Sequence, residues 1–230
     1  RVTQHEYVHT VGLSRTKNRV PHWFTEAQAV YLEDGPWDES RARRLTASLE
    51  ADELFPLDEL SYGFIRPRRP GDRSLAYAQS AWLYEYLVGR FGSQAPLDLM
   101  DAYADGQTQR EAFESVLGID QDDLESEFLS WATGQARNWG LLGREGMRGA
   151  GQLVRKYESD NAEGERGEGP SLADLLESYP DHPQLIEAVA RQRLEDNRGR
   201  PTPEMAGILS RWAEAVPVAD EPRRMLVLLA

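Results

Sequence analysis

Two stretches near the start of the chain decide its interpretation: QHEYVH at residues 4–9 and VPHWFTEAQAVYLED at residues 20–34. In a helix, His5 and His9 stand at i and i+4 and therefore share one face, one turn apart. At that spacing two imidazole nitrogens can reach one zinc ion at about 2.0–2.1 Å. Glu6 follows the first histidine and does not join that face, so we expect it to accept a proton from a metal-bound water.

The second stretch predicts an amphipathic helix that supplies a third ligand. Its apolar stripe runs through Trp23, Ala27 and Val30, and Glu26 falls at the edge of that stripe. A carboxylate among apolar groups is costly unless a cation or hydrogen-bond donors satisfy it, as zinc would. A surface glutamate is the alternative. His22, four residues before Glu26, could replace it as a ligand, donate to substrate, or be a partly exposed residue of the first turn.

Composition narrows the classes of site and partner. The chain has no cysteine, so any metal must be held by histidine and carboxylate. A formal net charge of −13 argues against binding to nucleic acid or to anionic lipid. No stretch approaches the roughly 18 apolar residues of a membrane span, so membrane insertion is not expected. Two histidines and one glutamate leave a fourth zinc position open, which is typical of catalytic rather than structural zinc sites.

The hydrophobic periodicity predicts a mainly α protein with little strand signal. Residues 54–72 hold three prolines and two glycines and are expected to be mostly loop. The chain opens at Arg1 within an expected helix, so we expect that upstream sequence, with any sheet, is missing. The helices are expected at about residues 1–13, 21–33, 73–91, 96–104, 108–117 and 121–134.

A change in composition divides the chain. The Gly/Glu-rich run NAEGERGEGP at residues 161–170 reads as solvated loop. We therefore predict a first domain over residues 1–140, a linker over 141–170 and a helical region over 171–230. In that last region, LLESYPDHPQLIEAVA aligns with RWAEAVPVADEPRRMLVLLA, which places Pro180 on Pro217. This pattern resembles tetratricopeptide (TPR) repeats, and an ordinary helical hairpin is the alternative.

HEYVH followed by PHWFTEAQAVYLE resembles the gluzincin clan of zinc metallopeptidases, specifically the bacterial peptidase MA-like families with an HExxH and a later P-x-W-x-x-E-G-x-A signature. The resemblance implies that His5, His9 and Glu26 bind Zn²⁺ and that Glu6 is the catalytic base. Ala27 departs from the glycine that the family commonly has there. The similarity extends over about residues 1–134 through FPLDEL (55–60), AYAQSAWLYEYLVGRFG (76–92) and LGIDQDDLESEFLSW (117–131).

On this resemblance we expect the C-terminal helical part of a thermolysin/gluzincin-like catalytic domain, followed by a TPR-like helical hairpin region. Its activity would be zinc-dependent hydrolysis of peptide bonds in a peptide or protein substrate. Tyr77 is the candidate donor to the oxyanion, with Tyr62 as its rival and a core aromatic role as the alternative. A non-catalytic module whose tail binds a protein partner is the competing function. Bacterial relatives are commonly extracytoplasmic, but these residues do not specify a compartment.

Overall fold

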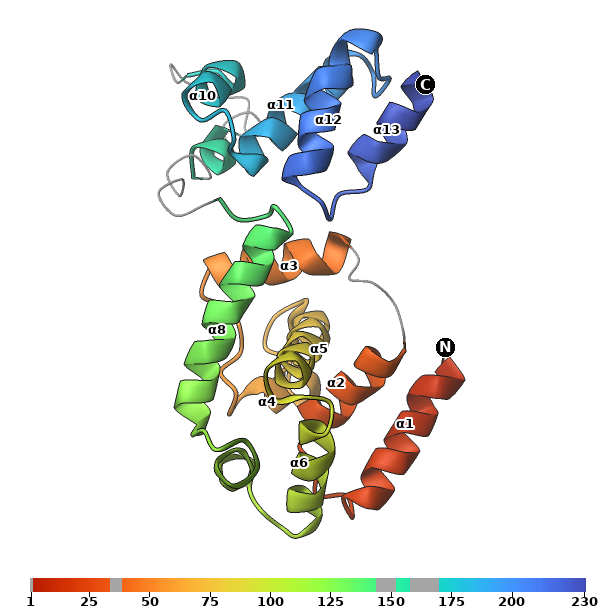
Figure 1. The fold of residues 1–230 in the computed structure, drawn as a ribbon, viewed down its shortest axis with the longest axis vertical. Helices are drawn as coiled ribbons and strands as arrows, with labels where there is room; N and C mark the ends of the chain where they lie inside the picture. The colour runs from red at the N-terminus through yellow and green to blue at the C-terminus, as the bar shows by residue number, and fades with distance from the viewer. Residues whose placement is uncertain (1, 34–38, 144–151, 158–169) are drawn as a thin grey trace. The chain divides into compact units, whose positions relative to one another are not determined.

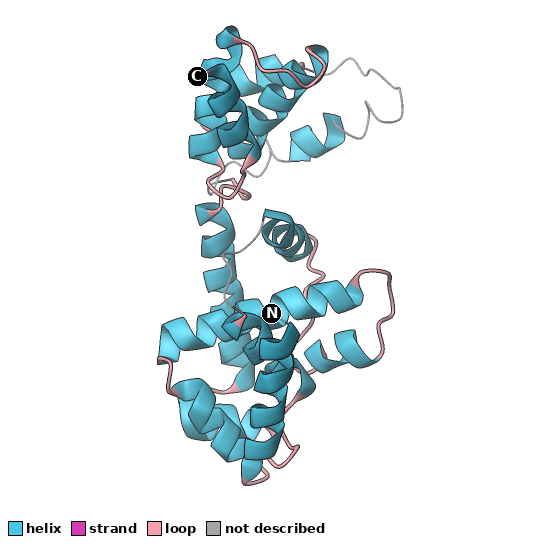
Figure 2. Ribbon diagram, turned by 90° about the vertical axis from the view of Figure 1, so that its right-hand side faces the viewer, coloured by secondary structure: helices cyan, strands magenta, loops and turns pink. Residues whose placement is uncertain are grey.

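The computed structural model describes residues 2–33, 39–143, 152–157 and 170–230. Regular structure in these residues is helical, and Figure 2 shows no strand among them. The mainly α fold expected from the sequence is therefore confirmed. No helix in the described ranges is both long and apolar enough to cross a membrane.

The chain forms two compact units. Unit 1 comprises residues 1–36 and 47–132, and unit 2 comprises residues 37–46 and 133–230. Helices α3 (Glu39–Glu50) and α8 (Gln121–Asn138) each run from one unit into the other. The predicted linker lies largely outside the described residues, but within it residues 152–157 are helical and bury Val154 in unit 2.

All six helices expected in the first part of the chain are present (Figure 1). The short helix α4 lies inside the expected loop of residues 54–72, because six residues are too few to show a helical period. The other elements of unit 1 are α1 (Val2–Arg15), α2 (His22–Leu32), α4 (Leu60–Ile65), α5 (Asp72–Phe91), α6 (Ala95–Ala104), α7 (Gln109–Ala112) and the π-helical turn η1 (Phe113–Leu117). Those of unit 2 are α10 (Leu172–Ser178), α11 (Pro183–Asp196), the 3₁₀ turn η2 (Pro203–Met205), α12 (Ala206–Ala215) and α13 (Glu221–Leu229).

Helix α2 is the central helix of unit 1. Every residue from Trp23 to Ala29 is buried, so this helix has no solvated face along two of its turns. It packs against α1, α4 and α5 (Figure 1). A helix that is buried on all sides belongs to the core, and any polar group on it must find its partner inside the protein.

Helix α1 packs on α2 through a face with little bulk. Its residues His5, His9 and Gly12 follow one another at intervals of four and three, which places them on one face, and Thr16 directly follows the helix. Gly12 and Thr16 are buried there. A Cβ atom on Gly12 would lie 3.3 Å from the Gln28 side-chain oxygen, so the glycine allows α1 to approach α2 closely.

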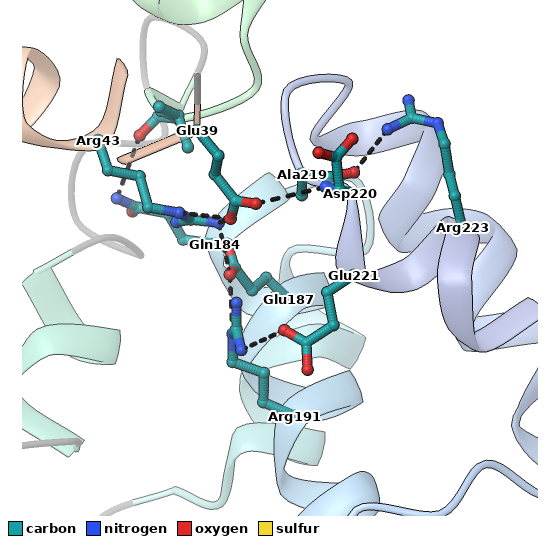
Figure 3. Close-up of polar contacts among 10 residues, drawn as sticks. Glu39, Arg43, Gln184, Glu187, Arg191, Ala219, Asp220, Glu221 and Arg223 are labelled. Atoms are coloured by element: carbon teal, nitrogen blue, oxygen red, sulfur yellow. Dashed lines mark hydrogen bonds and ion pairs between the residues drawn. The ribbon is translucent and has the colours of Figure 1, made fainter. Parts of the chain in front are cut away.

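Unit 2 contains a network of ion pairs around a buried carboxylate (Figure 3). Glu187 on α11 is 8% exposed and accepts hydrogen bonds from Arg43 at 2.7 Å and Arg191 at 2.9 Å. Arg43, on α3, also binds Glu39 at 2.8 Å, and Arg191 binds Glu221 at 2.6 Å. The network therefore ties α3 to α11 and α13 through the Glu187 carboxylate.

Substitution of Gly63 tests the packing of α4 on α5. An added Cβ would lie 2.7 Å from the Ala76 Cβ and 3.0 Å from the Phe55 ring, and the Ala76 atom cannot rotate away. We expect Gly63→Ala to lower the free energy of unfolding by about 1–3 kcal/mol, as overpacking does. The measurement is urea unfolding followed by tryptophan fluorescence.

Gly89→Ala is the matched control, because Gly89 lies in helix α5 with no atom within 4 Å of an added Cβ. Alanine is the better helix former, so this variant should gain up to about 1 kcal/mol. Equal effects of the two substitutions would contradict the close contact between α4 and α5.

Substitution of Glu187 tests the ion-pair network of unit 2. Glu187→Gln keeps the side-chain size but removes the charge that faces two arginines. The arginine side chains are 35% and 41% exposed, so the cost should be reduced by solvent to about 1–2 kcal/mol of unfolding free energy. Urea unfolding followed by circular dichroism measures it. Glu214→Gln, at an exposed position of α12, is the control, and equal stability of the two variants would refute the role of the network.

Candidate metal centre

Helices α1 and α2 bring three potential ligand atoms together. The Nε2 atoms of His5 and His9 lie 3.0 Å apart. The Oε2 atom of Glu26 lies 3.5 Å from His5 Nε2 and 3.4 Å from His9 Nε2. Among the described residues, these side chains form a group whose ligand atoms all lie within 4.8 Å of one another. Two ligands thus come from consecutive turns of α1 and the third from the buried helix α2.

The geometry of this cluster fits a zinc ion. Tetrahedral coordination at about 2.0–2.1 Å places ligand atoms about 3.3 Å apart, and the three separations in the cluster lie close to that value. Glu26 Oε2 is buried without a hydrogen-bond partner among the described residues. An unsatisfied carboxylate oxygen in a protein interior is costly, and a cation between the three side chains would remove that cost.

The side chains of the cluster are partly accessible to solvent. The side chains of His5 and His9 are 18% and 17% exposed, and that of Glu26 is 10% exposed. Glu6, on α1, is exposed. A metal held here would therefore be anchored on the core side by Glu26, beside two histidines that are partly accessible to solvent.

Comparison with known proteins agrees with this site. The sequence profile of the Peptidase MA superfamily matches residues 1–134. The chain belongs to the Peptidase MA superfamily. Membership implies a metallopeptidase-like domain, zinc as its metal and a peptide as its substrate class. No curated protein and no solved structure gives a significant match to the chain.

In this Peptidase MA domain, the pKa of the Tyr77 hydroxyl is affected by residues of the cluster. Burial raises the pKa of its hydroxyl, and the charge of Glu26, a hydrogen bond to Glu26 and the charge of Glu6 raise the pKa further. The hydroxyl therefore stays protonated at neutral pH. The Phe64 ring packs edge-on against Tyr77, with centroids 4.8 Å apart. Tyr62 is exposed on α4, and no described side-chain contact links it to the cluster.

His22 lies beside the cluster but outside the group of three. Its Nε2 atom is 3.7 Å from Glu26 Oε1, the carboxylate oxygen that does not face His5 and His9. The side chain is 44% exposed, and its ring packs edge-on against Phe64. Of the three roles considered from the sequence, this arrangement agrees with that of a partly exposed residue in the first turn of α2.

Two contacts of the cluster were not foreseen from the sequence. Thr25 Oγ1 lies 2.8 Å from His9 Nδ1, and Glu33 Oε1 lies 3.1 Å from His5 Nδ1. The sequence could have indicated the contact of Glu33, because Glu33 follows Glu26 by seven residues, or two helical turns, and therefore lies on the same side of α2. Thr25 directly precedes Glu26, and nothing in its spacing distinguishes it from an ordinary helix residue.

The zinc content of purified variants tests whether Glu26, rather than the neighbouring His22, is a ligand. We expect the parent chain to retain close to one zinc per chain after dialysis, measured by elemental mass spectrometry. Glu26→Ala should lose at least about tenfold in retained zinc, because loss of a ligand costs no less than loss of a supporting residue. His22→Ala is the control and should retain zinc like the parent. Zinc loss in His22→Ala as complete as in Glu26→Ala would make His22 a ligand instead.

Proposed function

We propose that the chain is a gluzincin-type zinc metallopeptidase that hydrolyses peptide bonds, with His5, His9 and Glu26 as ligands and Glu6 as general base. The main observation behind the proposal is that two histidine nitrogens and a Glu26 oxygen without a hydrogen bond lie close enough together to share one metal ion. This cluster lies within the region that matches the Peptidase MA superfamily.

The metal and the residues around it would have separate roles in hydrolysis. Zinc held by these residues would supply a Lewis acid for the scissile carbonyl and for the attacking water. Glu6 accepts one proton from that water as its oxygen bonds to the carbonyl carbon, and passes the proton to the leaving amine nitrogen. Tyr77 donates a hydrogen bond to the carbonyl oxygen while that oxygen carries negative charge.

The electrostatics of Tyr77 support this division. Burial and, to a smaller extent, the charges of Glu26 and Glu6 raise the pKa of its hydroxyl, so the tyrosine remains a neutral hydrogen-bond donor. A neutral donor stabilises an oxyanion without competing for the proton that Glu6 must move. Glu6 is exposed and therefore free to contact substrate and water.

We further propose that the chain comprises a catalytic domain over residues 1–140, a linker over 141–170 and a TPR-like region over 171–230 that binds a protein partner. Two observations support the repeat. Helices α10 and α11 form one helix–turn–helix and α12 and α13 another, and Pro180 and Pro217 occupy the equivalent turns. The competing function is a non-catalytic interaction module in which the same tail binds its partner.

The Glu6→Gln variant separates catalysis from metal binding. We expect it to bind zinc like the parent, because Glu6 is not among the three ligands. Its rate of peptide cleavage should fall by about 10²–10⁴-fold, the usual contribution of a general base. The measurement is cleavage of a peptide mixture by the zinc-loaded full chain, followed by mass spectrometry.

Glu114→Gln, an exposed glutamate of η1, serves as the control for loss of a carboxylate. Equal cleavage by Glu6→Gln, Glu114→Gln and the parent would refute the role of Glu6. A zinc-loaded parent that leaves every peptide intact would favour the interaction module.

A further inference from the structure

Both histidines of the cluster turn their second ring nitrogen toward helix α2. His9 Nδ1 lies 2.8 Å from the Thr25 hydroxyl oxygen. His5 Nδ1 lies 3.1 Å from Glu33 Oε1. Helix α2 and its C-terminal cap residue, Glu33, therefore place an oxygen atom beside the second ring nitrogen of each histidine, in addition to the Glu26 carboxylate.

We propose that Thr25 and Glu33 are positioning residues that orient His9 and His5 for metal binding and thereby set the affinity of the site for zinc. This inference rests on the proposed zinc site, and it assigns two residues outside the ligand set. Neither residue contacts the metal position; each acts through the histidine that it binds.

The physical reason lies in the two forms of neutral imidazole. A histidine that binds metal through Nε2 must carry its proton on Nδ1, and the group that accepts from Nδ1 selects that form. The acceptor also fixes the rotation of the ring, so the Nε2 lone pair points at the metal before it arrives. Thr25 Oγ1 is hydrogen-bonded to His9 in this way, and Glu33 Oε1 lies within ion-pair distance of His5 Nδ1.

Burial makes these two acceptors important. Thr25 is 5% exposed, so water has little access to the acceptor of His9. His5 Nδ1 is buried and makes no hydrogen bond to the described residues, and Glu33 Oε1 lies within ion-pair distance of it, at 3.1 Å. Loss of the Thr25 hydroxyl would leave the N–H of His9 unpaired when the metal binds, which costs free energy, and loss of Glu33 would remove the carboxylate that faces His5 Nδ1.

The end of α2 that carries Glu33 is held against α1. The Glu33 N–H donates to the Ala29 carbonyl oxygen at 3.1 Å, which continues the helical bonding to this residue. The Gln4 side chain on α1 donates to the Leu32 carbonyl oxygen at 2.6 Å. The backbone of Glu33 is therefore fixed relative to the helix that carries His5, as a positioning role requires.

Two substitutions of Thr25 test the first contact. Thr25→Val preserves the shape but removes the hydroxyl acceptor, whereas Thr25→Ser preserves the acceptor. We expect zinc affinity to fall by about 10–100-fold in Thr25→Val and to remain near that of the parent in Thr25→Ser. The affinity is measured on the full chain by competition with a chromophoric zinc chelator.

Two substitutions of Glu33 test the second contact in the same assay. Glu33→Ala removes the acceptor and should weaken zinc binding by about 10–100-fold. Glu33→Gln keeps a carbonyl acceptor of the same length and should weaken binding less. Glu114→Gln is the control for loss of a negative charge from unit 1 and should bind zinc like the parent.

Thermal unfolding of the metal-free variants separates positioning from packing. Positioning predicts weaker zinc binding with metal-free melting temperatures close to that of the parent. Lowered melting temperatures with unchanged affinity would overturn the inference, because the residues would then serve only the fold.

The Glu26→Ala variant separates this inference from the proposed function. Tight binding by the parent, weak binding by Glu26→Ala and parent-like affinity in Thr25→Val and Glu33→Ala would overturn the positioning role alone. A parent that binds no zinc, or a Glu26→Ala variant that binds as tightly as the parent, would overturn the zinc site and this inference together.

Discussion

The site depends on one constraint, which is the burial of a carboxylate on a helix with no solvated face. Glu26 belongs to a run of consecutive buried residues in α2, and its Oε2 atom has no hydrogen-bond partner among the described residues. Such a group is tolerated only when a cation or donors compensate for its lost hydration. The Nε2 atoms of His5 and His9 both lie near the same oxygen, so one metal ion could contact all three side chains.

This convergence requires α1 to lie close to α2. The contact face of α1 carries the two histidines followed by Gly12, whose lack of a side chain leaves room for Gln28 of α2. The same approach brings the far ring nitrogens within reach of Thr25 and Glu33. The geometry of the ligands therefore depends on the close packing of α1 on α2, which Gly12 allows.

The compact units do not coincide with the matched region. Residues 37–46 lie inside the match to the Peptidase MA superfamily, yet they belong to unit 2, where Arg43 binds the buried Glu187. The segment that follows the ligand-bearing helix is thus part of the same core as the C-terminal helices.

The sequence by itself determined the helical character, the pairing of His5 with His9 and the nomination of Glu26, because a helical period and the i, i+4 spacing are local properties. Tertiary structure decided which helices meet. It buried Tyr77, which raises the pKa of its hydroxyl, and gave the histidines their second contacts with Thr25 and Glu33. It also assigned the start of α3 to unit 2. These features depend on distances between segments far apart in the chain, and no local pattern encodes such distances.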